Sequence, residues 1–370
     1  MGAKSAALET ADLYLQLGLP LLACKTDNAA LFYNNKYSTH MPKYNIYGIG
    51  AALVDTEIEV TDSDLKYLEI GKGLMTLVDE DRQQEIIHHL QNQLSISKRA
   101  SGGSAANTVI ALSAFGGKAF YSCRVANDAD GKFYLRDLDN AGVEFNSNSA
   151  STGGLTGKCL VLITPDAERS MNTYLGVSEN FSIENLDAEA IRQSEYLYIE
   201  GYLVSSDTGR KAAIRAREIA EKCGIKTALT LSDPAMVTFF KSELKEILGK
   251  KIDLLFCNEA EAISWTEGSN LEHALELLKQ SAAAYVLTMG DKGAIVFDGE
   301  NQHLIEAHPT IAINTNGAGD MFAGAFLYGI THGHGYKKSG NFAALAAAHV
   351  VSQAGPRLNP EQYPKILASL

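Results

Sequence analysis

The stretch that decides the fold reads Asn314-Thr-Asn-Gly-Ala-Gly-Asp-Met-Phe-Ala-Gly-Ala-Phe326. It begins polar, passes through Gly317 and Gly319, and continues as a run of small and aromatic residues. This pattern predicts a loop that leads directly into a tightly packed helix. The first N–H groups of a helix have no intrahelical partner, and the helix dipole places about +0.5 charge there. We therefore expect a site for an anion such as phosphate at the start of this helix.

An acid, Asp320, lies in the first turn of the same predicted helix. A carboxylate adds nothing favourable to an anion site, so it needs another reason to be there. Two interpretations are open: Asp320 caps the helix, or it takes a proton from a hydroxyl group that attacks phosphorus. Helix physics favours neither over the other.

Composition restricts the class of partner. The chain has 370 residues, enough for one large domain with an appendage, and a net charge of −12 without any cluster of Lys and Arg. This argues against nucleic acid and favours a small metabolite. The five cysteines form no CxxC pair, which argues against a zinc site or a disulfide framework and indicates a reducing, cytoplasmic compartment. No apolar run reaches the roughly 18 residues of a membrane span.

Residues 1–40 differ in character from the rest and lack the features of a signal peptide. We expect an N-terminal extension of open status, followed by one domain over residues 41–370. Within that domain, residues 44–54 predict a single buried strand that ends at Asp55. Open α/β sheets bind ligands at the carboxyl ends of their strands, so Asp55 is a candidate substrate ligand as well as a candidate turn residue.

A double glycine opens the next predicted helix, in Ser101-Gly102-Gly103-Ser104-Ala-Ala-Asn107. The glycines allow a ligand to approach the backbone, and Asn107 offers an amide to hydroxyl groups. The alternative is a tight turn with Ser104 as the N-cap. Further on, residues 157–164 and 169–175 predict a hairpin that, together with residues 56–60, forms a small sheet over the site. This predicted lid spans about residues 55–62 and 155–176.

From residue 196 onward, predicted strands and helices alternate, which is typical of a mostly parallel sheet covered by helices on both faces. Asn258-Glu-Ala-Glu261 opens one helix, where acids commonly just complement the helix dipole. Thr288-Met-Gly290-Asp-Lys-Gly293 follows another strand.

In order and approximate spacing, these four motifs resemble those of the ribokinase-like (PfkB) carbohydrate kinase family, over roughly residues 44–356. Residues 50–55, 198–202 and the Thr315-Asn316 pair resemble the adenosine kinase branch of that family in particular. The resemblance implies a three-layer α/β/α fold with a mostly parallel central sheet and a small β-sheet lid.

The resemblance also implies roles for the motif residues. Asp320 is the expected base, and the amides of Gly317, Ala318 and Gly319 form the anion hole. The acceptor is expected at Asp55, Gly102, Gly103 and Asn107, with Arg169 reaching the transferred phosphoryl group and Tyr202 near a purine ring. ATP and Mg²⁺ are expected at Asn258, Glu261, Thr288, Gly290 and Gly293, with Glu261 holding Mg²⁺, directly or through water. Asn314 stands where the family has Asp, which removes a charge and argues against a monovalent-cation site.

We therefore expect ATP-dependent phosphorylation of a primary hydroxyl, in first place the 5′-hydroxyl of adenosine or a related purine nucleoside. A sugar kinase of the ribokinase or fructokinase type is the alternative. Tyr174 and Tyr202 would favour the purine if their rings face the site, although both also suit a core. A binding protein that has lost catalysis is a third reading, against which the intact Asp320 and glycines argue. The sequence leaves open whether the protein is a monomer or a homodimer.

Overall fold

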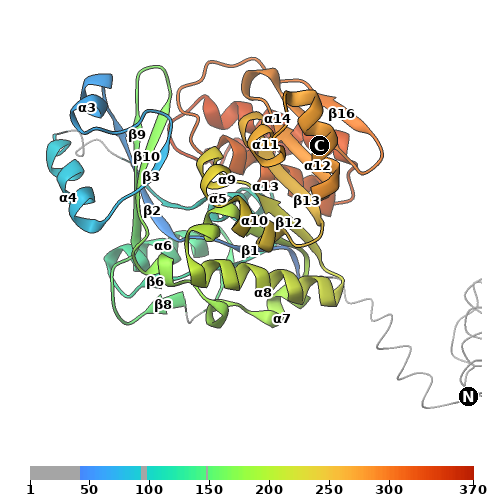
Figure 1. Ribbon diagram of the computed structural model, residues 1–370, viewed down its shortest axis with the longest axis horizontal. Helices are drawn as coiled ribbons and strands as arrows, with labels where there is room; N and C mark the ends of the chain where they lie inside the picture. The colour runs from blue at the N-terminus through green and yellow to red at the C-terminus, as the bar shows by residue number, and fades with distance from the viewer. Residues whose placement is uncertain (1–41, 93–97, 147–148) are drawn as a thin grey trace, which may run out of the picture. The chain divides into compact units, whose positions relative to one another are not determined.

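The computed structural model describes residues 42–92, 98–146 and 149–370, so the expected N-terminal extension lies outside the described residues. A central sheet of nine strands and a separate sheet of five strands organise this part of the chain (Figure 1). In spatial order the central sheet consists of β16 (Gln302–Ile305), β15 (Ala294–Phe297), β14 (Ala282–Thr288), β13 (Ile252–Asn258), β12 (Lys226–Thr230), β11 (Ser194–Glu200), β1 (Tyr44–Ile49), β5 (Ala119–Ser122) and β7 (Glu144–Phe145).

The strands from β14 to β7 are parallel, whereas β15 and β16 are antiparallel to their neighbours. Strand order reverses at β1, which lies between β11 and β5. At such a switch point the connections leave toward opposite faces, and a crevice opens beyond the carboxyl ends of the strands. The fold thus places a candidate site at the ends of β1 and β11.

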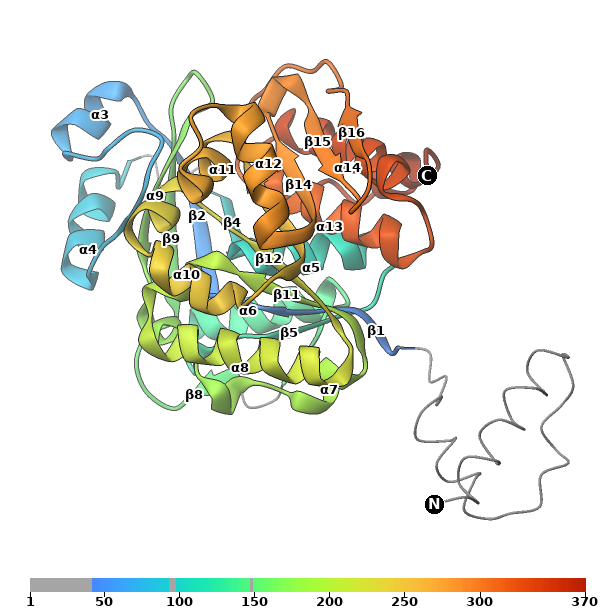
Figure 2. The ribbon, with the colours of Figure 1, turned by 45° about the vertical axis from the view of Figure 1, so that its right-hand side comes forward.

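Helices cover both faces of the central sheet (Figure 2). Successive strand residues face opposite sides: Tyr196 and Tyr198 of β11 belong to one core cluster, Leu197 and Ile199 to the other. One face packs against α5 (Ser104–Ala114), α6 (Ala129–Asn140), α13 (Ala318–Thr331), α14 (Tyr336–Val351) and α15 (Tyr363–Leu367). The other packs against α7 (Ala188–Arg192), α8 (Asp207–Cys223), α9 (Pro234–Phe239), α10 (Lys241–Leu248), α11 (Glu259–Thr266) and α12 (Leu271–Ser281).

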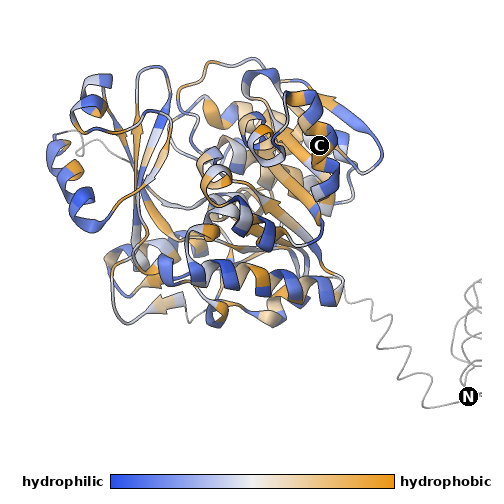
Figure 3. Cartoon of the chain, viewed as in Figure 1, coloured by the Kyte–Doolittle hydropathy of each residue, from blue (hydrophilic) through white to orange (hydrophobic). Residues whose placement is uncertain are grey.

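Figure 3 shows the consequence for hydropathy: the central strands are apolar, whereas a surface helix such as α8 alternates between polar and apolar residues. The predicted three-layer α/β/α arrangement is confirmed. In the described ranges, no helix combines the length and the apolar character needed to cross a membrane.

The five-stranded sheet is the lid that the sequence predicted. Its order is β3 (Met75–Leu77), β10 (Arg169–Tyr174), β9 (Gly157–Ile163), β2 (Leu53–Glu59) and β4 (Lys98–Gly102), of which β3 was not predicted and β4 falls where only a glycine turn was expected. Helices α3 (Asp62–Tyr67) and α4 (Glu80–His89) cover one face of this sheet (Figure 1), where Ile58, Leu65 and Ile86 form an apolar cluster. The other face is left for the site.

The prediction of one continuous strand over residues 44–54 was wrong. Strand β1 ends at Ile49, and β2 begins at Leu53 in the other sheet. At the break, the Ala51 N–H donates to the Glu200 carboxylate (3.2 Å), and Gly50 leaves room for this carboxylate, since a Cβ there would lie 2.4 Å from one of its oxygens. Asp55 therefore lies inside a lid strand and not at the end of a core strand.

Candidate active site

A cavity of about 710 Å³ lies between the crevice of the central sheet and the lid. Of the fifteen site residues predicted from the sequence, the cavity is lined by fourteen: Asp55, Gly103, Asn107, Arg169, Tyr202, Asn258, Glu261, Thr288, Gly290, Gly293, Gly317, Ala318, Gly319 and Asp320. The remaining one, Gly102, lies behind Asp55. Motifs more than 200 residues apart in the chain thus meet in one place.

The predicted anion hole has the expected backbone geometry. Helix α13 begins after Gly317, whose φ of 75° is a left-handed conformation, and no side chain caps the helix. A Cβ on Gly317 would lie 2.6 Å from Pro356, so this position requires glycine. A Cβ on Gly319 would meet no atom within 4 Å, because Gly319 borders the open cavity. The first turn of α13 therefore presents its amides to free space.

Asp320 does not cap its helix. Its carboxylate oxygens accept hydrogen bonds from two side chains of α5, Ser104 Oγ (2.6 Å) and Asn107 Nδ2 (3.1 Å). Burial raises the pKa of Asp320, while these two hydrogen bonds and the charge of Arg169 act in the opposite direction. Asp320 is thus a fixed carboxylate with remaining acceptor capacity, directed into the cavity.

Ser104 is not the N-cap of α5. That position belongs to Gly103, whose φ is 95° and whose hypothetical Cβ would lie 2.2 Å from the carbonyl oxygen of Ala51. Gly102 has a different reason to be glycine, since a Cβ there would lie 2.0 Å from the Asp55 carboxylate. Gly102 thus makes room for Asp55, and not for a ligand as the sequence suggested.

The Asp55 carboxyl group, on the face of the lid that borders the cavity, forms a polar floor there. Burial, followed by the charge of Glu57, raises the pKa of Asp55 to about 8. Close to this floor, the Oδ1 atom of Asn107 is buried and has no hydrogen-bond partner among the described residues. The Asn107 oxygen is thus an acceptor that awaits a donor, and the Asp55 carboxyl group, with its pKa of about 8, can donate one hydrogen bond as well as accept.

Apolar side chains lie on the same face of the lid sheet as Asp55. Met75, Leu77, Met171 and Leu175 line the cavity, and Leu53 and Cys159 extend this surface. Tyr174 does not contribute, because alternation along β10 places it on the face opposite Met171. Tyr202 does line the cavity, with its hydroxyl donating to the Ser232 carbonyl at 3.4 Å.

The Asn258-to-Glu261 motif forms a complete capping box at the start of α11. Asn258 Oδ1 accepts from the Glu261 N–H (2.8 Å), and Glu261 accepts from Asn258 Nδ2 (2.7 Å) and from the Asn258 N–H (3.0 Å). Glu261 is nevertheless part of the cavity wall, and burial raises its pKa to about 7. The motif therefore caps a helix and also places a carboxylate in the cavity.

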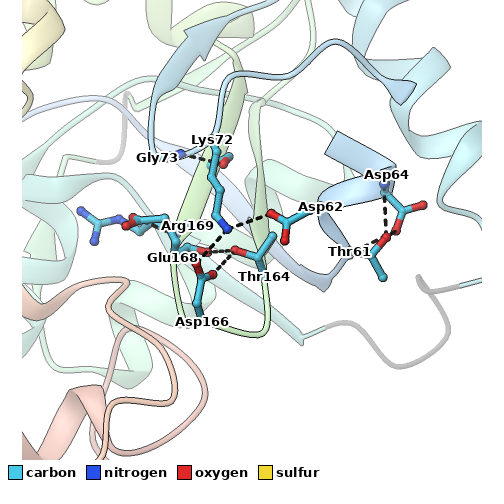
Figure 4. Close-up of polar contacts among 10 residues, drawn as sticks. Thr61, Asp62, Asp64, Lys72, Gly73, Thr164, Asp166, Glu168 and Arg169 are labelled. Atoms are coloured by element: carbon cyan, nitrogen blue, oxygen red, sulfur yellow. Dashed lines mark hydrogen bonds and ion pairs between the residues drawn. The ribbon is translucent and has the colours of Figure 1, made fainter. Parts of the chain in front are cut away.

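Arg169 reaches from the lid to the loop that precedes α13. Its Nη1 atom donates to the carbonyl (3.0 Å) and to the hydroxyl (3.2 Å) of Thr315. Figure 4 shows Arg169 next to the turn of the lid hairpin, where Lys72 bridges Asp62 and Asp166 at 2.8 Å each. These exposed ion pairs tie the hairpin turn to α3.

Acids predominate in the cavity wall. Among the described residues that line the cavity, one is an arginine, Arg169, and five are acids: Asp55, Glu200, Glu261, Asp291 and Asp320. A polyanionic ligand would need further positive charge here. Together with the placement of Glu261, this suits a divalent cation bound along with the ligand.

Sequence reasoning missed Glu200, at the end of β11. Its buried carboxylate accepts from the N–H groups of Ala105 (2.8 Å) and Ala51 (3.2 Å), and burial raises its pKa to about 7. Glu200 thereby fixes the start of α5 against the segment that connects the two sheets. Like Asp55 in the sequence-based prediction, Glu200 is an acid at the end of a strand, and this feature could have identified it.

A second residue that was not predicted, Arg357, holds strand β4 in place. Its Nη1 atom pairs with Asp137 at 2.7 Å, and its Nη2 atom donates to Ser101 Oγ at 2.6 Å. The adjacent Pro356 lies against Gly317. No local motif marks this role, because Ser101 and Asp137, which the guanidinium contacts, are distant in the sequence.

Comparison with known proteins agrees with this geometry. The profile of the pfkB family of carbohydrate kinases matches residues 75–362. The chain is 27% identical to adenosine kinase from Saccharomyces cerevisiae, over 85% of this chain and 96% of that protein. The crystal structure of adenosine kinase from Sinorhizobium meliloti superimposes with a TM-score of 0.81 at 33% identity, covering 87% of this chain and 99% of the other.

A probable sugar kinase from Rhizobium etli superimposes with a TM-score of 0.83 at 30% identity, covering 89% of this chain and 100% of the other. The similarity thus extends to proteins named for nucleosides and to proteins named for sugars. The chain belongs to the pfkB family of carbohydrate kinases and is a sugar or nucleoside kinase.

Proposed function

We propose that the protein transfers the γ-phosphoryl group of ATP to the 5′-hydroxyl of adenosine or a related purine nucleoside. The observation that supports this proposal is that the part of the cavity expected to hold the acceptor substrate has both polar and apolar groups. Asp55 and Asn107 offer acceptors for the hydroxyls of a ribose, while Met75, Leu77, Met171 and Leu175 offer an apolar surface. A nucleoside has both a polar and an apolar half, whereas a free sugar makes little use of the apolar wall.

Asp320 is the proposed base. With its oxygens oriented by Ser104 and Asn107, it would accept the proton of the attacking hydroxyl. The amides at the start of α13 would stabilise the charge on the phosphoryl group, and Arg169 would add its charge from the lid.

Mg²⁺ fits the proposed nucleotide end of the cavity, next to Glu261. Both Glu261 oxygens already accept hydrogen bonds from Asn258, so we expect Glu261 to hold the ion through water. When bound, Mg²⁺ neutralises part of the triphosphate charge. Thr288, Gly290 and Gly293 line the same end and would contact the nucleotide.

The test is a comparison of acceptors with one enzyme preparation. ADP release is measured with adenosine, inosine, guanosine, ribose and fructose, and mass spectrometry identifies the position of the phosphate in the product. We expect at least one purine nucleoside to give a kcat/KM at least tenfold above either sugar. Preference for ribose or fructose would establish the sugar kinase alternative, and no ADP release with any acceptor would refute both.

A further inference from the structure

A buried contact joins the lid to the loop of the anion hole. Glu57 Oε1 accepts hydrogen bonds from Asn314 Nδ2 (2.9 Å) and from Asn316 Nδ2 (3.1 Å). All three residues are buried, with exposed fractions of 8% for Glu57, 1% for Asn314 and 7% for Asn316. A carboxylate in such a place needs donors, and here two amides supply them.

The network determines the orientation of the Asn314 amide. Its Oδ1 atom accepts from the backbone N–H of Asn316 (2.8 Å), which leaves Nδ2 to face Glu57. An aspartate at position 314 could keep the first hydrogen bond but would direct its second oxygen at the Glu57 carboxylate. Glu57 and Asn314 are therefore a matched acceptor and donor, and each limits the residue types that the other position can hold.

The contact connects the strand that is proposed to bind the acceptor with the loop of the anion hole. Glu57 and Asp55 are two residues apart and lie on the same face of β2, so the strand that carries the acceptor ligand also carries the carboxylate. On the other side, Asn316 immediately precedes Gly317, the first residue of the anion hole. Thr315, between the two asparagines, is held by Arg169 from another lid strand.

We propose that Glu57 is a positioning residue that aligns the anion hole with the acceptor through Asn314 and Asn316. This inference rests on the proposed function. Glu57 does not need to touch either substrate. Its effect is on the distance between the acceptor hydroxyl, held from β2, and the phosphorus, held from α13. A misplacement of about 1 Å can lower turnover about 100-fold, and KM changes less because the individual binding groups remain.

A charge-exchange experiment tests the proposal. In Asn314→Asp, two carboxylates face each other, and we expect kcat to fall about 10- to 100-fold with KM for ATP and nucleoside within about threefold. In the double variant Glu57→Gln/Asn314→Asp, the new amide donates to Asp and accepts from Asn316, so we expect kcat to recover to within about threefold of Glu57→Gln alone.

Glu59→Gln is the matched control. Glu59 lies on the same strand, two residues further along, but is exposed, and we expect wild-type kinetics for this variant. If Asn314→Asp fails to fold, Glu57→Ala replaces it, because it leaves both amides without their acceptor and adds no charge. The same fall in kcat with little change in KM is expected for Glu57→Ala.

The wild-type assay distinguishes a failure of the proposed function from a failure of the proposed role of Glu57. No nucleoside phosphorylation by the wild type refutes the proposed function and, with it, this inference. Turnover in the wild type combined with equal kcat values for Asn314→Asp and the double variant refutes the role of Glu57 alone. A change that appears only in the free energy of unfolding, with kcat preserved in every variant, also refutes it, because it would show a purely structural contact.

Discussion

Replacing Gly319 by alanine is expected to leave the fold intact and to remove activity. Gly319 lies in the first turn of α13, and an added Cβ would meet no protein atom within 4 Å. Alanine is favoured over glycine inside a helix by about 0.5–1 kcal/mol, so the free energy of unfolding should stay constant or rise by up to that amount.

The same methyl group would project into the space in front of the anion-hole amides. If a phosphoryl group occupies this space in the transition state, the variant loses part of that stabilisation. Loss of one donor in a comparable oxyanion hole costs about 10²- to 10³-fold in kcat, and we expect an effect of this size. ADP release with adenosine measures kcat, and urea unfolding measures stability on the same sample.

Gly317→Ala is the informative comparison. Gly317 lies close to Gly319, but alanine at position 317 is expected to lower the free energy of unfolding. Its φ of 75° and the 2.6 Å approach to Pro356 predict a loss of at least about 1–2 kcal/mol of stability. Gly319→Ala with near-normal kcat would show that the space at α13 does not hold the phosphoryl group. Gly319→Ala as unstable as Gly317→Ala would refute the structural part of the reasoning.

Three further outcomes are expected. The pKa of Asp55 is raised to about 8, so its contribution to stability is present below about pH 4 and is lost as the pH rises toward 8. The Tm of the unligated wild type should therefore fall between pH 5.5 and 8.5, and Asp55→Asn should make this fall smaller. Because Asn314 donates to Glu57 where a cation would need an oxygen, kcat should be equal in potassium and tetramethylammonium salts, and activation by potassium would contradict this. Met171→Gln, which makes the lid wall polar, should raise KM for the nucleoside about fivefold, the effect of about 1 kcal/mol, and leave KM for ribose unchanged.

The parts of the site that could be predicted from the sequence are those that depend on local patterns. A glycine-containing loop followed by a helix of small residues specifies an anion hole regardless of the remaining chain, as around Gly317. Alternating strands and helices likewise specify a mostly parallel sheet with helices on both faces. Both predictions needed only residues close together in the sequence.

The parts that could not be predicted depend on distant partners. No local pattern marks Glu57, because its two asparagine partners are more than 250 positions away. The break between β1 and β2 depends in the same way on Glu200, about 150 positions further along. In such cases the local pattern is compatible with several environments, and tertiary contacts decide among them.

For Tyr174 the sequence left two interpretations open, a purine contact and a core residue. Arg169 and Tyr174 are five residues apart in one strand, and alternation places an odd separation on opposite faces. Assigning Arg169 to the site therefore already excluded Tyr174 from it. The signal that decides between the two interpretations was present in the sequence.

The most direct test of the central claim, that Asp320 is the base, is a single-turnover measurement of phosphoryl transfer in Asp320→Asn. Asparagine preserves the size of the side chain and an oxygen for the Ser104 hydroxyl, but it cannot take the proton. Affinities for ATP and nucleoside are determined by calorimetry, so that transfer is compared at saturation. We predict transfer about 10²- to 10⁴-fold slower than in the wild type, with both affinities within a few-fold. A transfer rate within a few-fold of the wild type would contradict the assignment of Asp320 as the base.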